Sequence, residues 1–161
     1  MPSNIVMLRK HTILFLGVVL IASMLLITFW PVNCGEMLRH NEGLYVVFST
    51  RKDPVGFTTA DWRLEADDPA VRQVVSAVEK YTCHRTWKTQ KDNQTSMGTG
   101  ERWMYVYDGD TGECLLRCLG GGNVVSREQV YSLYGGDSAQ LVEDVYQVLI
   151  NSGVEGTSAQ Q

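Results

Sequence analysis

The sequence has few of the side chains on which catalytic sites most often depend. It contains three histidines, and only His40 and His84 follow its long apolar segment. A nucleophilic cysteine or serine needs a base beside it. His40 lies in a polar stretch and His84 among charged residues, so we expect both imidazoles in solvent. Residues 120–122 are glycines, but no Gly-Lys-Ser/Thr follows them as in a phosphate-binding loop. The sequence predicts no catalytic constellation.

Closely spaced metal ligands are also missing. The sequence has four cysteines but no Cys-x-x-Cys pair, the spacing that makes a zinc site recognisable. Suitable ligand types without that spacing are Cys83, His84, Cys114 and Cys118. The loop 108–112 begins like a calcium loop, but Leu119 stands where the last acidic ligand would be. We therefore expect neither a metal nor another cofactor.

Three cysteines are candidates for a disulfide. Cys114 and Cys118 are expected on one face of the same strand, about 13 Å apart, and an unbent strand cannot join them. A bridge from Cys83 to one of them is one expectation, because a helix predicted to end near Cys83 would cover the sheet. Unpaired thiols packed as small hydrophobic groups are the alternative.

The N-terminal part lacks acidic residues, the first being Glu36, and residues 13–30, from Ile13 to Trp30, carry no charge. As a helix this segment would be about 27 Å long, close to the hydrocarbon thickness of a bilayer. Only Ser23 and Thr28 interrupt its apolar surface, whereas the core helix of a soluble domain would show a polar face. We therefore expect a transmembrane helix with the lipid bilayer as its partner.

The charges around this segment predict its orientation. Arg9 and Lys10 precede it, so the positive-inside rule places residues 1–12 in the cytoplasm and the remainder outside. No Ala-x-Ala-like pair of small residues follows the segment, and Asn33 fits poorly before a lipidated Cys34. An uncleaved signal anchor of the cell membrane is favoured, with cleavage and lipidation of Cys34 as alternatives.

The part beyond the anchor is acidic. With Arg9 and Lys10 set aside, 12 basic residues stand against 18 acidic ones, a net charge of about −6. This balance argues against a basic nucleic-acid-binding surface, so no nucleic acid is expected as a partner. The length suits one domain after the anchor.

Hydrophobic periodicity predicts an α+β domain at residues 44–152, with an antiparallel sheet packed against two main helices. A juxtamembrane linker at 31–43 and a flexible tail at 153–161 would flank it. The expected strands are 44–50, 62–66 and a hairpin of 101–107 with 113–119.

Capping residues predict the helix starts. One main helix would begin at Pro69 after Asp67 or Asp68, and the other after Asp137 or Ser138. The pattern Ser126-x-x-Gln129 predicts a short helix between them. A turn is expected at 53–56, and an exposed loop at 89–100 contains the glycosylation sequon of Asn93.

Aromatic residues are frequent between positions 103 and 134 and predict a partner surface. Its candidate members are Trp103, Tyr105, Tyr107, Tyr131 and Tyr134. Strand alternation puts the first three on one face, with Met104 and Val106 toward the helices. The alternative is that the aromatic face forms the core.

One stretch carries a resemblance to a family. Met104-Tyr-Val-Tyr-Asp-Gly-Asp-Thr-Gly-Glu-Cys-Leu-Leu116, with the glycines after it and Val130-Tyr-Ser-Leu-Tyr134, resembles small proteins that Gram-positive bacteria hold behind a signal anchor. These proteins are grouped as domains of unknown function. The resemblance implies an exported α+β domain and assigns no catalytic residues.

Together these patterns favour a membrane-anchored extracytoplasmic interaction or ligand-sensing module, whose partner is a protein or a small ligand. One alternative is an exported enzyme, either a hydrolase or a thiol enzyme that uses Cys83 or Cys114. Another is an accessory subunit of a membrane complex.

Overall fold

A computed structural model describes residues 3–38, 43–51, 57–89, 102–119 and 121–160. The chain divides into two compact units, Met1–Trp30 and Pro31–Gln161. The expected turn at 53–56 and residues 90–100 of the expected loop, with Asn93, lie outside the described residues.

The first unit consists of the helix α1 (Ser3–Phe29). Its segment Thr12–Phe29 has a mean hydropathy of 2.6, and none of its residues is buried. The Ser23 hydroxyl donates to the Val19 carbonyl at 2.8 Å and the Thr28 hydroxyl to the Met24 carbonyl at 2.9 Å, so both are satisfied within the helix. The helix is long and apolar enough to cross a membrane.

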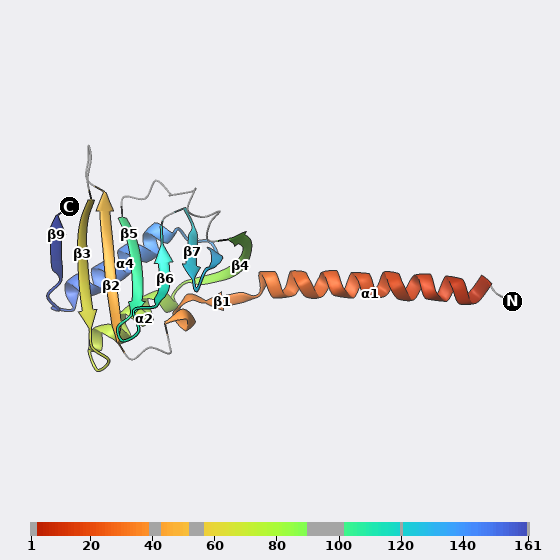
Figure 1. Cartoon of the computed structure of the whole chain (residues 1–161), viewed down its shortest axis with the longest axis horizontal. Helices are drawn as coiled ribbons and strands as arrows, with labels where there is room; N and C mark the ends of the chain where they lie inside the picture. Colours follow the sequence, from red (N-terminus) through yellow and green to blue (C-terminus); the bar gives the residue numbers. More distant parts are fainter. Residues whose placement is uncertain (1–2, 39–42, 52–56, 90–101, 120, 161) are drawn as a thin grey trace. The chain divides into compact units, whose positions relative to one another are not determined.

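The second unit is an α+β domain, as predicted (Figure 1). Its two main helices are α2 (Pro69–Glu79) and α4 (Ser138–Asn151), and a 3-10 turn η1 covers Cys34–Met37. Its strands are β1 (Pro31–Asn33), β2 (Leu44–Arg51), β3 (Phe57–Leu64), β4 (Thr82–Thr89), β5 (Arg102–Asp108), β6 (Cys114–Cys118), β7 (Asn123–Ser126), β8 (Gln129–Leu133) and β9 (Thr157–Gln160).

The nine strands of the described residues form one sheet in the order β1-β4-β8-β7-β6-β5-β2-β3-β9, and every neighbouring pair is antiparallel. The predicted β5–β6 hairpin is confirmed, with Met104 opposite Cys118. On its other side β5 pairs with β2, which places Tyr45 opposite Tyr107. The central strands are thus held by long-range pairing.

Both predicted helix starts are confirmed. The Asp68 carboxylate accepts a hydrogen bond from the Ala70 amide at 2.8 Å, and Pro69 takes the first helical position, where no amide is needed. The Asp137 carboxylate caps α4 in the same way, through the Ala139 amide at 3.0 Å.

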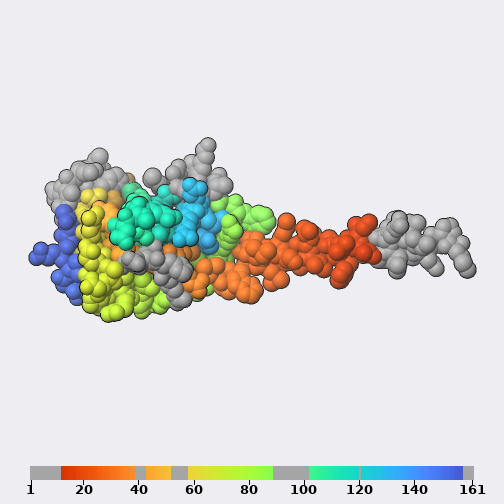
Figure 2. All heavy atoms as spheres, turned by 60° about the horizontal axis from the view of Figure 1, so that its bottom comes forward, coloured from red at the N-terminus to blue at the C-terminus, as the bar shows by residue number. Residues whose placement is uncertain are grey.

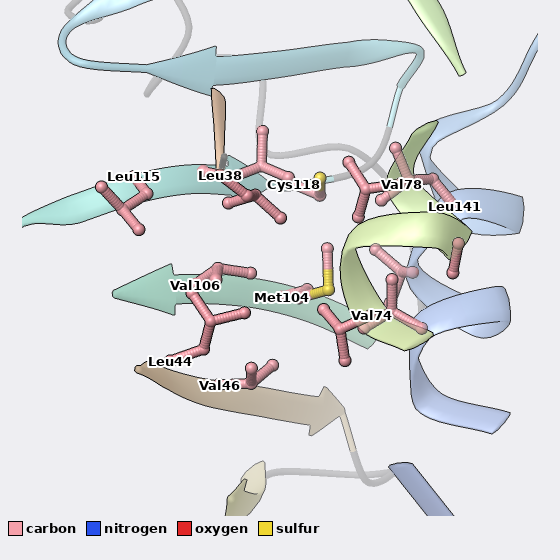
Figure 3. Packing of buried hydrophobic residues seen from close by; sticks show 14 of the residues in the cluster. Leu38, Leu44, Val46, Val74, Val78, Met104, Val106, Leu115, Cys118 and Leu141 are labelled. Atoms are coloured by element: carbon pink, nitrogen blue, oxygen red, sulfur yellow. The ribbon is translucent and has the colours of Figure 1, made fainter. Parts of the chain in front are cut away.

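The two helices cover one face of the sheet. In Figure 1, α4 crosses behind the strands β2, β5 and β6. Figure 3 shows Leu44 and Val46 of β2 and Met104 of β5 pointing to the side on which α2 lies, and all three are fully buried. Val74 of α2 is also fully buried. Alternate residues of β2 and β5 therefore contribute to the core.

Aromatic residues tie α4 to the β2–β3 part of this core. The Phe48 ring lies edge-on to Trp62 at 5.6 Å and to Tyr146 at 5.2 Å between ring centroids. Arg102 reaches the same place, with its guanidinium 3.7 Å from the Tyr146 centroid and 2.6 Å from the Glu143 carboxylate. These contacts fix the position of α4 across the sheet.

The short helix predicted at Ser126 is wrong. Its residues form the β7–β8 hairpin, with Ser126 opposite Gln129. Arg127 and Glu128 make the two-residue turn with φ of 45° and 69°, the left-handed geometry that matches the twist of a hairpin. Pairing on both sides of β8 outweighs the local capping pattern, because it satisfies more backbone groups than two helical turns would.

Two segments expected outside the domain form parts of its sheet. Within the expected linker 31–43, Pro31–Asn33 pairs with β4 as β1, and Cys34 and Leu38 are buried. Within the expected tail 153–161, Thr157–Gln160 pairs with β3 as β9. The strand predicted at 62–66 is β3, which is longer than predicted and runs from Phe57 to Leu64.

One-sided burial predicts losses of stability of different size for neighbouring substitutions in β5. Met104→Ala should lower the free energy of unfolding by about 2–5 kcal/mol, because the Met104 side chain is fully buried. Tyr105→Thr should cost only about 1 kcal/mol, because threonine keeps the β-propensity on the half-buried face. Denaturant unfolding of the full chain in detergent measures both. Equal losses would show that both faces of β5 are core.

Candidate functional site

The face of the sheet opposite the helices carries a group of tyrosines, which we call the tyrosine face: Tyr45, Tyr105 and Tyr107. Tyr45 of β2 lies opposite Tyr107 of β5, with ring centroids 5.9 Å apart. Tyr105 and Tyr107, two residues apart on β5, stack with their rings 6.4 Å apart and inclined by 14°. All three are half-buried, so each keeps an accessible edge.

Charged side chains border the tyrosine face on both sides. Arg63 of β3 lies opposite Tyr45, with its guanidinium 5.8 Å from the ring centroid. Arg117 of β6 lies opposite Tyr105 on the other side. Figure 2 shows β9 and β3, in violet-blue and yellow, side by side on the viewed surface. The site thus combines flat aromatic rings with charges at its edges, a composition typical of binding hot spots.

The tyrosine hydroxyls are donors at neutral pH. Burial raises the pKa of Tyr45, Tyr105 and Tyr107 above the usual value for tyrosine. At Tyr45 the neighbouring Asp61 carboxylate raises the pKa further, by its charge and through a hydrogen bond. A partner on this face would therefore meet neutral hydroxyl groups that both donate and accept hydrogen bonds.

The structure brings together some of the aromatic residues predicted for a partner surface and separates the others. Trp103, Tyr105 and Tyr107 share the face opposite the helices, so the alternative that they form the core is wrong. Tyr131 packs against the core cluster instead. Tyr134, directly after β8, lies against His84 with ring centroids 4.7 Å apart and ring planes inclined by 45°.

Sequence reasoning missed Tyr45. Its strand was predicted, and the alternation of Leu44, Val46 and Phe48 already indicated that Tyr45 points away from the core. What was missing is the pairing of β2 with β5, which join across more than fifty residues of chain. Only this long-range register places Tyr45 against Tyr107.

A bulge separates the two cysteines of β6. Tyr107 pairs with Cys114 but Val106 pairs with Leu116, so Leu115 is an extra residue in β6. Cys114 therefore lies beside the tyrosine face, whereas Cys118 is buried in the core. The expectation that both share one face is wrong, because it assumed an unbulged strand. Cys114 borders a hollow of about 310 Å³ that Arg117 and Arg127 also line.

Cys83 has its thiol neighbour in Cys34. The β1–β4 pairing puts Val32 opposite Cys83, and the Cys34 amide donates to the Tyr81 carbonyl at 3.0 Å. The Cys83 thiol donates to the Val32 carbonyl at 3.5 Å, and the neighbouring Cys34 thiol together with burial raises the pKa of Cys83. All four cysteines are free thiols in the structure. The core position of Cys34 also argues against its lipidation, because a lipid-bearing sulfur must reach the membrane.

The structure does not bring Cys83, Cys114 and His84 together as a site for thiol catalysis or metal binding. Cys83 and His84 are consecutive in a strand and therefore point to opposite faces. The described residues contain no group of three or more histidine, cysteine or acidic side chains that could hold a metal ion. His40 lies outside the described residues. The side chains around the hollow at Cys114 are Glu113, Arg117, Val125, Arg127 and Glu128.

Comparison of the chain with known proteins found no match among family models, curated proteins or solved structures. The resemblance to signal-anchored proteins of Gram-positive bacteria stays a prediction. Fold and site define an α+β domain that follows an apolar, membrane-length helix and exposes tyrosines on its open sheet face.

The burial of the four cysteines predicts their reactivity. In the native full chain an aromatic disulfide reagent should modify one thiol, Cys114, because the other three are fully buried and out of the reagent's reach. All four should react after denaturation. Cys114→Ser should abolish the native reaction. Rapid native labelling of Cys34, Cys83 or Cys118 would contradict the core packing described here.

Proposed function

We propose that the protein is a membrane-anchored module whose domain lies outside the cytoplasm and binds a partner through the tyrosine face. The anchor is supported by the apolar, uncharged segment Thr12–Phe29. The orientation is supported by Arg9 and Lys10, which precede that segment, whereas every acidic residue follows it. The domain is then the acidic, extracytoplasmic part of the chain.

The observation that carries the binding role is the placement of Tyr45, Tyr105 and Tyr107 together on the open side of the sheet. An open face needs only polar residues to stay soluble, so three packed tyrosines are more than solubility requires. Their rings are held by strand pairing and mutual stacking, so little side-chain freedom would be lost on binding. Arg63 and Arg117 at the two edges supply charged contacts around this centre.

Orientation is tested with a tag placed after Gln161. External protease added to intact cells should remove the tag, because the positive-inside rule puts the domain outside. Replacing Arg9 and Lys10 by glutamate should protect a larger fraction of the tag. A cytoplasmic protein in the same cells serves as the control for intactness. A tag that stays protected in the unaltered chain would place the domain in the cytoplasm.

Partner binding is tested by photo-crosslinking in the membranes of cells that make the protein. A benzoylphenylalanine at position 107 should give a defined protein adduct on irradiation, because Tyr107 lies at the centre of the tyrosine face. Tyr105→Thr in the same chain should lower the adduct yield on the order of tenfold, the effect of losing one hot-spot residue.

The matched control uses the same photoreactive residue at position 150. Ile150 is an exposed apolar residue of α4, the helix on the other side of the sheet. It should give no such adduct. Equal adducts from positions 107 and 150 would mean that the tyrosine face is not the binding surface.

A further inference from the structure

The strand β1 is the part of the domain that follows the membrane-length helix in the sequence. α1 ends at Phe29 and β1 begins at Pro31, so a single residue, Trp30, separates them. Pro31 is paired with His84 of β4, and the two strands lie side by side in Figure 1. Because β4 is antiparallel to β1, its residues after His84 extend past the point where β1 begins. They therefore run toward the side from which the chain enters the domain.

That extension of β4 carries a bulge. Arg85 pairs with Tyr131 and Thr89 with Gln129, so residues 86–88 of β4 stand opposite the single residue Val130. Thr86 organises the bulge: its hydroxyl donates to the Val130 carbonyl at 2.9 Å and accepts from the Lys88 amide at 3.3 Å. The Gln129 side-chain amide donates to the Thr86 carbonyl at 2.9 Å. The bulge is a specific, hydrogen-bonded feature.

The bulge exposes a tryptophan. Trp87 is 75% exposed, against 50% for Ile150 and 46% for Tyr134, the other exposed large apolar residues of the described domain. An ordered loop that holds a large indole in water gains nothing for folding, because the ring buries little area there. Bulges commonly re-aim a side chain for a purpose outside the sheet.

Basic side chains flank this tryptophan in an otherwise acidic domain. Arg85 and Lys88 are both exposed. The adjacent β7–β8 turn adds one charge of each sign, Arg127 and Glu128, and Arg127 already lies 3.7 Å from the Glu113 carboxylate. The bulge itself therefore presents two positive charges around an indole. This combination suits the headgroup region of a bilayer, where tryptophan is enriched and basic residues meet lipid phosphates.

The geometry points to the β4 bulge, residues 85–88, as a second membrane contact: Trp87 enters the interfacial region while Arg85 and Lys88 bind the phosphates of anionic lipids. The inference rests on the anchor of the proposed function, since the tether would hold the domain close to the bilayer. Such a contact would restrain rotation of the domain about the anchor and so present the tyrosine face in a defined direction.

The test uses the full chain reconstituted in vesicles of phosphatidylcholine and phosphatidylglycerol, with or without bromine on the upper acyl chains. All variants carry Trp30→Phe, because Trp30 directly follows the anchor helix and would itself be quenched. Bromolipid should still quench tryptophan fluorescence in this background. Adding Trp87→Phe should reduce the quenching to the level seen with unbrominated lipid.

Trp103→Phe in the same background is the matched control and should leave the quenching unchanged, because Trp103 lies opposite Ser49 on the open sheet face. Quenching should be stronger in vesicles that contain phosphatidylglycerol than in vesicles of phosphatidylcholine alone. The double substitution Arg85→Gln and Lys88→Gln should abolish this difference. The proposal is overturned if Trp30→Phe alone removes all quenching, or if Trp87→Phe leaves it intact. Flotation of the unaltered chain with the vesicles after an alkaline wash tests the anchor separately. A chain that fails to float disproves the anchor. Quenching is scored only on chains that float.

Discussion

Burial of the sheet on one side only is the constraint on which the other features of the domain depend. α2 and α4 cover one face, and the interlocked rings of Phe48, Trp62 and Tyr146 set α4 across it. Every second residue of β2 and β5 is then committed to the core. The residues between them must lie on the open face. There the chain places tyrosines, which the proposed binding role uses.

Hydrogen bonds from Asn33 connect the start of the domain to the end of α2. The Asn33 side-chain amide donates to the Glu79 carbonyl at 2.8 Å, and its oxygen accepts from the Gly35 amide at 2.8 Å. A Cβ at Gly35 would collide with the side chain of Glu79, so glycine is required for this close approach. Cys34, directly after β1, is fully buried, so the chain enters the core within three residues of the start of β1.

Two bulges change which side chains of the sheet are exposed. The extra Leu115 in β6 moves Cys114 to the open face while Cys118 stays in the core. Residues 86–88 of β4 direct Trp87 into solvent. In each case one strand gains residues relative to its partner, and the side-chain alternation shifts at that point. Positions that a regular strand would bury are thereby exposed, and exposure is what a contact with lipid or with a partner needs.

Local patterns in the sequence determined the apolar helix, the two capped helices, the β5–β6 hairpin and the inward direction of Met104 and Val106, because each depends on residues close together in the chain. Tertiary structure decided the rest. β1 and β9 are too short to show periodicity, and β8 became a strand against a helix-capping pattern because it found partners on both sides. The tyrosine face and the Cys34–Cys83 contact join segments far apart in sequence. Their register depends on which strands pair across the whole sheet, and no local periodicity encodes that choice.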